Sequence, residues 1–466
     1  MIAMTIAEIA AAVGGAAAGP DDTLVTGPAF VDSRAPEPGG LFAAVLGEHV
    51  DGHDFAAGAV AAGAAAVLSS RPLGLPGVVV PDVVAALGRL AQWVASRLTG
   101  VTVVGITGSQ GKTSTKDLLA QLLETVGQTV APVGSFNTEV GVPLTVLRAG
   151  AATDFLVVEM GARGIGHIAY LADIVRPRVG VVLNVGVAHL GEFGSRAAIA
   201  EGKSELVQAL PADGVAVLNA DDELVQRMRT KTSARVMSFG YGPEADLRID
   251  EVRLDDVGRV RFRLGYGGDL REIALALVGR HHAANAAAAA TAALACGLTF
   301  DQVCSALGSA SVRSAWRMAL TTRADGVTVI NDAYNANPDS MRAALETLAE
   351  LGRGRGDGAR TLAVLGEMRE LGDTSLEAHE AVGRLLAELG ISQVVAVGES
   401  ARAIASAASQ QQTWQGRSVE VPDSAAAARY LQEEVRPGDV VLVKASRAAG
   451  LETLAGVLAT DRAAAQ

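Results

Sequence analysis

The chain has 466 residues, of which 49% are hydrophobic and 19% charged. That length exceeds what one hydrophobic core serves, so about two to four domains are expected. A net charge of −12 excludes a general nucleic-acid-binding surface, and an anionic ligand would need local basic groups. The two cysteines, Cys296 and Cys304, provide neither a disulfide framework nor a metal motif, which fits a reducing cytoplasm.

Residues 1 to about 98 predict a small α/β unit. The N-terminus lacks the basic start of a signal peptide, and Thr5 followed by Glu8 predicts a capping box that opens a short helix. Asp32, Ser33 and Arg34 follow a strand, where they could bind a polar ligand or form an ordinary capped turn. Further strands are expected at Leu41–Val45, Ala66–Ser69 and Gly77–Val80.

The most informative stretch is VTVVGITGSQGKTSTKDLL, residues 101–119. It combines a β-branched strand, a glycine loop, Lys112, Thr113 and a helix, the layout of a nucleotide phosphate cradle. Backbone N–H groups and the helix N-terminus hold phosphates, Lys112 reaches the terminal phosphates, and Thr113 offers its hydroxyl to Mg²⁺. One departure is Ile106, which stands where the common pattern has glycine. The alternative is a plain glycine turn between a buried strand and a helix.

Strands and helices alternate over residues 99–316, which predicts a parallel sheet covered on both faces. Strands expected at Phe155–Val158 and Val179–Leu183 are followed by Glu159 and His189 respectively. Ligands bind at the carboxyl ends of parallel strands, so both side chains are expected beside the phosphate loop. Glu159 could hold Mg²⁺ or cap a helix, and His189 could bind a metal, transfer a proton or be structural.

Three later features have ordinary structural interpretations. Lys203, with a glutamate two residues away on either side, is typical of a solvated helix surface. His281 and His282 are adjacent in a helix and should face different ways, and no third ligand is suitably spaced, so no metal site is expected. The alanine-rich run Ala283–Cys296, broken by Asn285, predicts a buried helix and not a membrane span.

Residues 317–466 begin again with four strand–loop–helix units, in 327–351, 361–372, 391–400 and 439–458, which predict a smaller doubly wound domain. The expected fold class is therefore α/β with three domains: a small N-terminal domain (1–98), a central P-loop-type parallel-sheet domain (99–316) and a C-terminal Rossmann-like domain (317–466). Polar side chains follow the C-terminal strands: Asp332, Tyr334, Asn335 and Asn337; Glu367 and Glu370; Lys444, Ser446 and Arg447.

A series of strings along nearly the whole chain resembles the Mur ligase family, the ATP-dependent amide-bond enzymes of peptidoglycan synthesis. The strings are DSR, LFAAVLGEHVDGHDF, GITGSQGKTSTK, GSFNTEVGVPLTVL, EMGARGIGHI, NVGVAHLGEFGS, IAEGKSEL, NDAYNANPDSM, VLGEMRELG and VKASRAAGLE. They resemble in particular the branch that joins D-alanyl-D-alanine to UDP-N-acetylmuramoyl-tripeptide. The Asp-Asn-Pro-Arg string typical of the ligase that adds the third peptide residue is not found.

The resemblance implies a role for each domain: UDP-sugar-peptide binding, ATP binding, and nucleotide and acceptor contacts, in chain order. It implies ATP contacts at Gly108, Ser109, Gln110, Gly111, Lys112, Thr113, Ser114, Asn285, Arg317, Asp332, Tyr334 and Asn335. It implies catalytic roles for Lys112, Glu159, His189 and Lys203, and two Mg²⁺ ions held by Thr113, Glu159, His189 and a carbamylated Lys203. It implies substrate contacts at Ser33, Arg34, Asn137, Thr138, Lys444, Ser446 and Arg447. His282 and Thr138 stand where relatives often have asparagine, and His282 is left out of the binding set.

The implied chemistry is activation of a carboxylate as an acyl phosphate, followed by attack of the dipeptide amine, in a cytoplasmic monomer that binds no nucleic acid. A mobile third domain would close over the acyl phosphate and exclude water. Three alternatives are weighed: a sister ligase with another acceptor, a non-catalytic nucleotide-binding protein, and a P-loop kinase or GTPase. The DSR and NDAYNANPDSM strings argue against the first, and intact Lys112, Thr113 and Glu159 against the second. The multidomain layout argues against the third.

Overall fold

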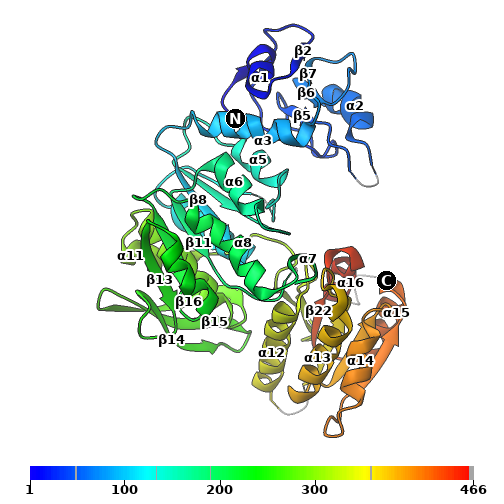
Figure 1. Cartoon of the computed structure of the whole chain (residues 1–466). Coiled ribbons are helices and arrows are strands. Elements are labelled where there is room, and N and C mark those ends of the chain that lie inside the picture. Colours follow the sequence, from blue (N-terminus) through cyan, green and yellow to red (C-terminus); the bar gives the residue numbers. More distant parts are fainter. Residues whose placement is uncertain (48–49, 133, 189, 357–358, 461–466) are drawn as a thin grey trace.

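The computed structural model describes residues 1–47, 50–132, 134–188, 190–356 and 359–460. It shows three α/β domains in chain order, built around sheets of five, nine and six strands (Figure 1). The expected fold class is confirmed. In the described part of the chain, every helix is too short or too polar to cross a membrane.

The N-terminal domain is a small sheet with helices beside it. The predicted capping box is present: Glu8 N–H donates to Thr5 Oγ1 at 3.2 Å, and Thr5 N–H donates to Glu8 Oε2 at 2.8 Å. The three expected strands form, two of them ending one or two residues early. The sheet order is β2 (Ala16–Ala18), β7 (Gly77–Val79), β6 (Ala66–Ser69), β5 (Leu41–Ala43), β4 (Ala29–Phe30). The helices are α1 (Ile6–Val13), α2 (Ala56–Ala61) and α3 (Val83–Ala95), and β1 (Met4–Thr5) pairs with β3 (Leu24–Val25).

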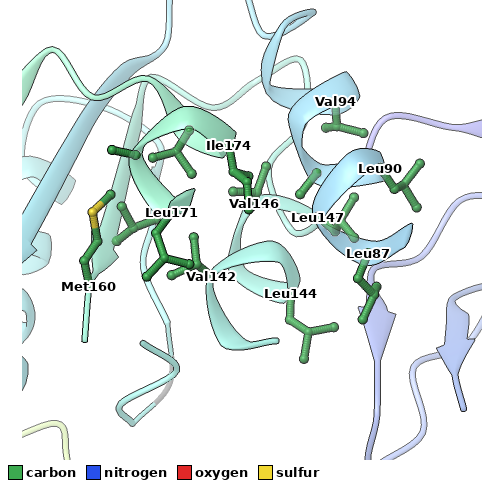
Figure 2. Close-up of a cluster of buried hydrophobic side chains, with 14 of the residues drawn as sticks. Leu87, Leu90, Val94, Val142, Leu144, Val146, Leu147, Met160, Leu171 and Ile174 are labelled. Carbon is green, nitrogen blue, oxygen red and sulfur yellow. The ribbon is translucent and has the colours of Figure 1, made fainter. Parts of the chain in front are cut away.

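The helix α3 joins this domain to the next one. Its buried residues Leu87, Leu90 and Val94 share one apolar core with Val142 and Ile174 of the central domain. Figure 2 shows this cluster, with α3 facing α5 (Gly141–Val146) and α6 (His167–Val175). Because the core is continuous, burial of its apolar surface stabilises the two domains against one another.

The central sheet is parallel over most of its width. Its order is β9 (Thr129–Val130), β10 (Phe155–Glu159), β8 (Thr102–Thr107), β11 (Val179–Val182), β12 (Val215–Asn219), β13 (Arg235–Gly240), β14 (Leu247–Leu254), β15 (Arg259–Tyr266), β16 (Asp269–Val278). The last two pairings, β14–β15 and β15–β16, are antiparallel. In register, Glu159 lies opposite Ile106 and Val182 opposite Thr107, so the carboxyl ends of β10, β8 and β11 meet at one edge.

Helices cover both faces of this sheet. On one face lie α4 (Lys112–Glu124), α10 (His282–Ala295) and α11 (Phe300–Ser309), and on the other α6 and α8 (Arg196–Gln208). The alanine-rich segment is the predicted buried helix: in α10, the run 286–290 consists of alanines with no exposed surface, and α10 packs directly against α4. Shorter helices α7 (Leu190–Phe193) and α9 (Glu223–Gln226) complete the domain.

The C-terminal sheet contains the strands of the four predicted units and two strands that were not predicted. Its order is β17 (Ala319–Thr322), β18 (Thr328–Asn331), β22 (Val440–Lys444), β19 (Thr361–Leu365), β20 (Gln393–Val397), β21 (Arg417–Val421), with only β17 antiparallel. The helices are α12 (Pro338–Gly354), α13 (Ser375–Glu388), α14 (Arg402–Ser409), α15 (Ser424–Glu434) and α16 (Leu451–Ala459). The unit β21–α15 was not predicted, because RSVEV is a half-exposed edge strand whose charges conceal its strand pattern.

The chain crosses between the last two domains at Trp316, Arg317 and Met318. Trp316 has φ 58° and Met318 has φ 50°, both in the left-handed region that side chains with a Cβ rarely adopt. Two such residues flanking Arg317 give the connection a sharp, defined bend. The bend holds Arg317 with its guanidinium 4.2 Å from the ring centre of Tyr334 in the C-terminal domain.

Candidate active site

A cavity of about 500 Å³ lies between the central and C-terminal domains. Most of the residues expected at the site line it: Ser109, Gln110, Gly111, Lys112, Thr113, Ser114, Asn137, Thr138, Glu159, Asn285, Arg317, Asp332, Tyr334, Asn335, Lys444, Ser446 and Arg447. Gly108, Lys203, Ser33 and Arg34 are not in its lining, and His189 lies outside the described residues.

The glycine loop joins the end of β8 to the start of α4. Ile106 is fully buried within the strand, so the loop proper is Gly108–Gly111, shorter than the common pattern. Gly111 has φ 81° at the N-cap of α4, and a Cβ there would lie 2.4 Å from Asn285 Oδ1, so both backbone and space require glycine. Asn184 Oδ1 accepts the N–H groups of Ser109 and Gln110 at 3.0 Å each, which fixes the loop.

Lys112 occupies the first position of α4. Its Nζ donates to the carbonyl oxygen of Gly108 at 2.8 Å, so the ammonium folds back over the loop. Burial lowers the pKa of Lys112, and Glu159 opposes this shift by favouring the charged form. A lysine at this place can pair with a phosphate that approaches the N-terminus of α4.

Glu159 is buried at the end of β10 and has two hydrogen-bond donors. Thr113 Oγ1 donates to its Oε2 at 2.8 Å, and Asn137 Nδ2 donates to its Oε1 at 2.8 Å. Hydroxyl and carboxylate oxygens are the protein donors that Mg²⁺ prefers, so Thr113 and Glu159 fit that ion. In the described residues no group of three or more His, Cys, Asp or Glu gathers to hold a metal.

Lys203 is buried on α8, so the surface interpretation drawn from its sequence neighbours is wrong. Those neighbours are engaged elsewhere: Glu201 pairs with Lys231 at 2.5 Å, and Glu205 accepts the N–H of Ala169 at 2.9 Å. Burial, with a smaller effect of Lys112, lowers the pKa of Lys203 to about 7. A large fraction of this amine is therefore neutral at neutral pH, which makes it nucleophilic.

The C-terminal wall of the cavity is held by an ion pair. Lys444 Nζ, at the end of β22, lies 2.5 Å from Asp332 Oδ2 and donates to the carbonyl oxygen of Asn335 at 3.0 Å. Asp332 Oδ1 also accepts the N–H of Met318 at 3.1 Å. Lys444 is almost fully buried, and its contacts brace the wall and the bend between the domains.

Aromatic rings and arginines form the outer part of the same wall. Arg317 stacks over Tyr334, and the guanidinium of Arg447 lies 4.1 Å from the ring centre of Trp316. The hydroxyl of Tyr334 is hydrogen-bonded to Ser135 Oγ of the central domain. Planar cations and rings stacked in this way can enclose a flat aromatic ligand such as a nucleotide base.

Several cavity residues were missed by the sequence reasoning, and His281 and His282 are the clearest case. Their ring centres lie 4.2 Å apart and both line the cavity, so the expectation that they face different ways is wrong. His281 is the N-cap of α10 and has helical backbone angles (φ −60°, ψ −21°), yet its ring lies beside that of His282. Burial lowers the pKa of His281 to about 4 and that of His282 well below its ordinary value, so both are neutral at neutral pH. Other unpredicted lining residues are Ser135, Glu139, Arg163, His167 and Arg369. The lining also includes Ser340 and Glu370, and the sequence indicates Glu370 only as a polar residue after a strand.

The residues expected to bind substrate in the N-terminal domain form a turn. Arg34 is exposed, and its Nε and Nη2 donate to the carboxylate of Asp32 at 2.8 and 2.7 Å. Hydrogen bonds from the Arg34 side chain and backbone lower the pKa of Asp32 to about 2. The geometry is that of a capped turn, and substrate binding by Ser33 and Arg34 stays a prediction.

Fold and cavity together define a nucleotide-binding protein of three α/β domains. Three family models match consecutive parts of the chain: "Mur ligase family, catalytic domain" over residues 30–93, "Mur ligase middle domain" over 106–293, and "Mur ligase, glutamate ligase domain" over 316–447. The chain belongs to the Mur ligase family.

Individual relatives match over the full length. A Mycobacterium tuberculosis protein named UDP-N-acetylmuramoyl-tripeptide–D-alanyl-D-alanine ligase is 48% identical over 99% of this chain and 98% of its own. The Escherichia coli protein of the same name is 35% identical over 98% of this chain and 99% of its own. The crystal structure of MurF from Acinetobacter baumannii superposes with a TM-score of 0.85 at 32% identity, covering 98% and 99% of the two chains. The crystal structure of MurF ligase from Thermotoga maritima in complex with ADP superposes with a TM-score of 0.77 at 30% identity, covering 93% of this chain and 97% of its own.

Proposed function

We propose that this protein is an ATP-dependent ligase that joins D-alanyl-D-alanine to UDP-N-acetylmuramoyl-tripeptide, with release of ADP and phosphate. The observation that carries the ATP-dependent part is the contact between Thr113 and Glu159 beside Lys112 at the N-terminus of α4. This place combines backbone N–H groups that can bind phosphate, the Lys112 ammonium, and the oxygen atoms of Thr113 and Glu159. The acceptor and donor substrates are taken from the names of the full-length relatives.

The proposed reaction begins with attack of the tripeptide carboxylate on the γ-phosphate of ATP, which gives an acyl phosphate and ADP. Two anions approach one another in this step. Lys112 and the N–H groups of the glycine loop offset their repulsion and stabilise the charge that spreads over the phosphoryl oxygens. The dipeptide amine then attacks the acyl carbon, and phosphate leaves from the tetrahedral intermediate.

Mg²⁺ would supply charge neutralisation on the phosphates, and Thr113 and Glu159 are the residues proposed to hold it, with His189 proposed for a second ion. The neutral amine of Lys203 is proposed to add to CO₂ and lose a proton, which gives a carbamate anion. The lowered pKa of Lys203 supports this step, because only the unprotonated amine can form the new N–C bond.

The remaining assignments follow from the positions of the residues. ATP is proposed to lie with its phosphates on Gly108–Ser114, and with its base and ribose against Asn285, Arg317, Asp332, Tyr334 and Asn335. Asn137, Thr138, Ser446 and Arg447 are proposed to contact substrate, with Lys444 acting through the wall that it braces. We propose that residues 1–98 bind the UDP-sugar peptide, 99–316 bind ATP, and 317–466 contact nucleotide and acceptor. A cytoplasmic monomer is proposed, and Cys296 and Cys304 are free thiols, as a reducing compartment requires.

The direct test is ADP release with ATP, Mg²⁺ and UDP-N-acetylmuramoyl-tripeptide, with and without D-alanyl-D-alanine. Release that requires the dipeptide and fails with single amino acids supports the proposal. Release with a single amino acid would instead indicate a sister ligase, and no release with either diamino-acid form of the tripeptide would contradict ligase activity. The matched negative control is Lys112→Ala, and the product is identified by its mass.

Closure of the C-terminal domain is part of the proposal, since water would hydrolyse the acyl phosphate. Small-angle scattering of the protein with an ATP analogue and both substrates is expected to show compaction. An unchanged radius of gyration would count against closure without contradicting the ligase reaction.

A further inference from the structure

One loop of the central domain, residues 184–188, is held by hydrogen bonds from several sides. Asn184 binds the glycine loop, Val185 N–H donates to Asp222 Oδ2 at 2.7 Å, and Gly186 N–H donates to Ser109 Oγ at 2.9 Å. Through Asn184 and Gly186, the conformation of this loop is tied to two residues of the phosphate cradle, Ser109 and Gln110.

One further tie comes from the other domain. Val187 N–H donates to Asp339 Oδ2 at 3.3 Å, and Asp339 lies in the first turn of α12 in the C-terminal domain. Among the described residues, the other hydrogen bonds of the loop given above come from within the central domain, so Asp339 is where the position of α12 reaches the loop. Residues on either side of this contact, Ala188 and Ser340, line the cavity.

Gly186 leaves space for that carboxylate. A Cβ on Gly186 would lie 2.1 Å from Asp339 Oδ2, far inside van der Waals contact, while its next neighbours would be Asp339 Cγ and Ser109 Cβ at 3.3 Å. The φ of Gly186 is not in the left-handed region, so alanine is compatible with its backbone. An alanine there would collide with the Asp339 carboxylate of the docked C-terminal domain, whereas its tight 3.3 Å contact with Ser109 Cβ in the central domain needs a shift of only a few tenths of an ångström.

We propose that Asp339 is a positioning residue, which couples docking of the C-terminal domain to the geometry of the phosphate cradle through the loop 184–188. Docking brings the carboxylate to Val187 N–H, and the loop passes this restraint to Ser109 through Gly186. Undocking breaks the hydrogen bond between Val187 N–H and Asp339, so the phosphate cradle can change its conformation. The proposal uses the ligase reaction as one readout, and its second readout, amide exchange at Val187, does not depend on the proposed function.

The test is a double-mutant cycle of Asp339→Ala and Gly186→Ala. Asp339→Ala is expected to lower kcat about tenfold, because a charge-assisted hydrogen bond is lost, with ADP affinity near that of the wild type. Gly186→Ala is expected to lower kcat about 100-fold, because the added methyl group and the Asp339 carboxylate cannot both occupy the docked arrangement. The double variant should recover to the level of Asp339→Ala, since the clash needs the carboxylate. If the fold reduction of kcat in the double variant equals the product of the reductions in the two single variants, the proposal is overturned.

Hydrogen exchange gives the second readout with the wild-type chain as reference. The Val187 amide should exchange faster in Asp339→Ala and in Gly186→Ala. In Asp339→Asn it should stay protected, because the amide oxygen still accepts. Unchanged exchange at Val187 in Asp339→Ala would overturn the proposal even if the protein proved not to be a ligase.

Two substitutions serve as matched controls. Glu346→Ala removes another acid of α12, at a site half-exposed to solvent, and Gly308→Ala adds a methyl group where, apart from the local backbone of its own helix, no atom of the described residues lies within 4 Å. Both should keep kcat and the exchange rate of Val187 within about twofold of the wild type. Thermal unfolding midpoints of all the variants separate loss of coupling from loss of fold.

Discussion

Arg280 and Glu350 form a two-pronged ion pair that joins the central and C-terminal domains, with Nε to Oε2 at 2.8 Å and Nη2 to Oε1 at 2.7 Å. Arg280 precedes α10, and Glu350 lies in the last part of α12. The two side chains are 52% and 26% exposed, so solvent screens their attraction. The pair therefore favours the docked arrangement without locking it.

Glu350→Gln is expected to weaken docking and lower kcat/KM about two- to fivefold at low ionic strength. The difference from the wild type should disappear in high salt, where the wild-type pair is itself screened. The measurement is the ligation rate of both proteins over a series of KCl concentrations. Glu380→Gln, which removes an ion pair within α13, is the matched control and should show no such dependence. A salt-independent defect in Glu350→Gln would contradict an electrostatic role.

Thr113→Val and Glu159→Gln each remove one of the oxygen groups assigned to Mg²⁺. Each is expected to lower kcat about 100- to 1,000-fold, because the developing charge on the phosphates loses its compensation. ADP binding measured by calorimetry without Mg²⁺ should stay near the wild-type value. Thr115→Val is the matched control on the same helix: the buried Thr115 Oγ1 has no hydrogen-bond partner among the described residues, so its loss should be neutral or stabilising. Full activity in Thr113→Val would contradict the assignment.

Lys203→Met is expected to separate stability from activity. The pKa of Lys203 is about 7 in the folded protein and 10.5 in a solvated lysine, so the unfolded chain binds more protons between these pH values. Wild-type stability therefore rises with pH through this window, and the burial penalty is fully present below pH 7. In CO₂-free buffer the methionine variant should gain about 4 kcal/mol of unfolding free energy at pH 7, and the gain should shrink as the pH rises and vanish above about pH 10.5.

The same variant should lose ligation, because it cannot form a carbamate. Wild-type activity should fall when CO₂ is removed and return with added bicarbonate, whereas the variant should not respond. Denaturant unfolding at several pH values and rates with and without bicarbonate are the measurements. Bicarbonate-independent wild-type activity would contradict the proposed carbamate and leave the stability prediction standing.

His281 should stay neutral well below neutral pH. Its pKa of about 4 lies under the 6.5 of a solvated histidine, so the unfolded chain takes up the proton first as the pH falls. Its contribution to stability is complete above pH 6.5 and is lost between pH 6.5 and 4. Nitrogen chemical shifts of His281, measured by NMR from pH 7 to 5, are expected to remain those of a neutral ring. A midpoint near 6.5 would show that the ring is solvated.

Much of the fold was predictable because its signals are local. The capping box at Thr5, the strand before the glycine loop and the alanine-rich helix each depend on residues close in sequence. The phosphate cradle was also predictable, since strand, loop and helix are contiguous there. The strand β21 was missed because an exposed edge strand need not show the apolar face that a buried one does.

The rest of the site needs contacts between distant segments. Burial of Lys203 depends on how α8 packs against the sheet, which its flanking glutamates conceal. His281 and His282 both line the cavity because it lies at the start of α10, between two domains, and no residue spacing reports that position. The contact of Asp339 with the loop 184–188 joins residues some 150 positions apart. Such contacts depend on how whole domains dock against each other. Domain docking leaves no periodic pattern or residue spacing in a single sequence.

The alanine side chains of α10 set the distance between α10 and α4, the helix that begins at the phosphate cradle. Small side chains let α10 lie close to α4, and this closeness sets Asn285 against Gly111. Alanine usually tolerates replacement by another small apolar residue. Here each added methylene group would push α10 away from α4. Substitutions such as Ala287→Leu should therefore displace Lys112 at a distance, and natural variation at the buried alanines of this helix should be confined to the smallest side chains.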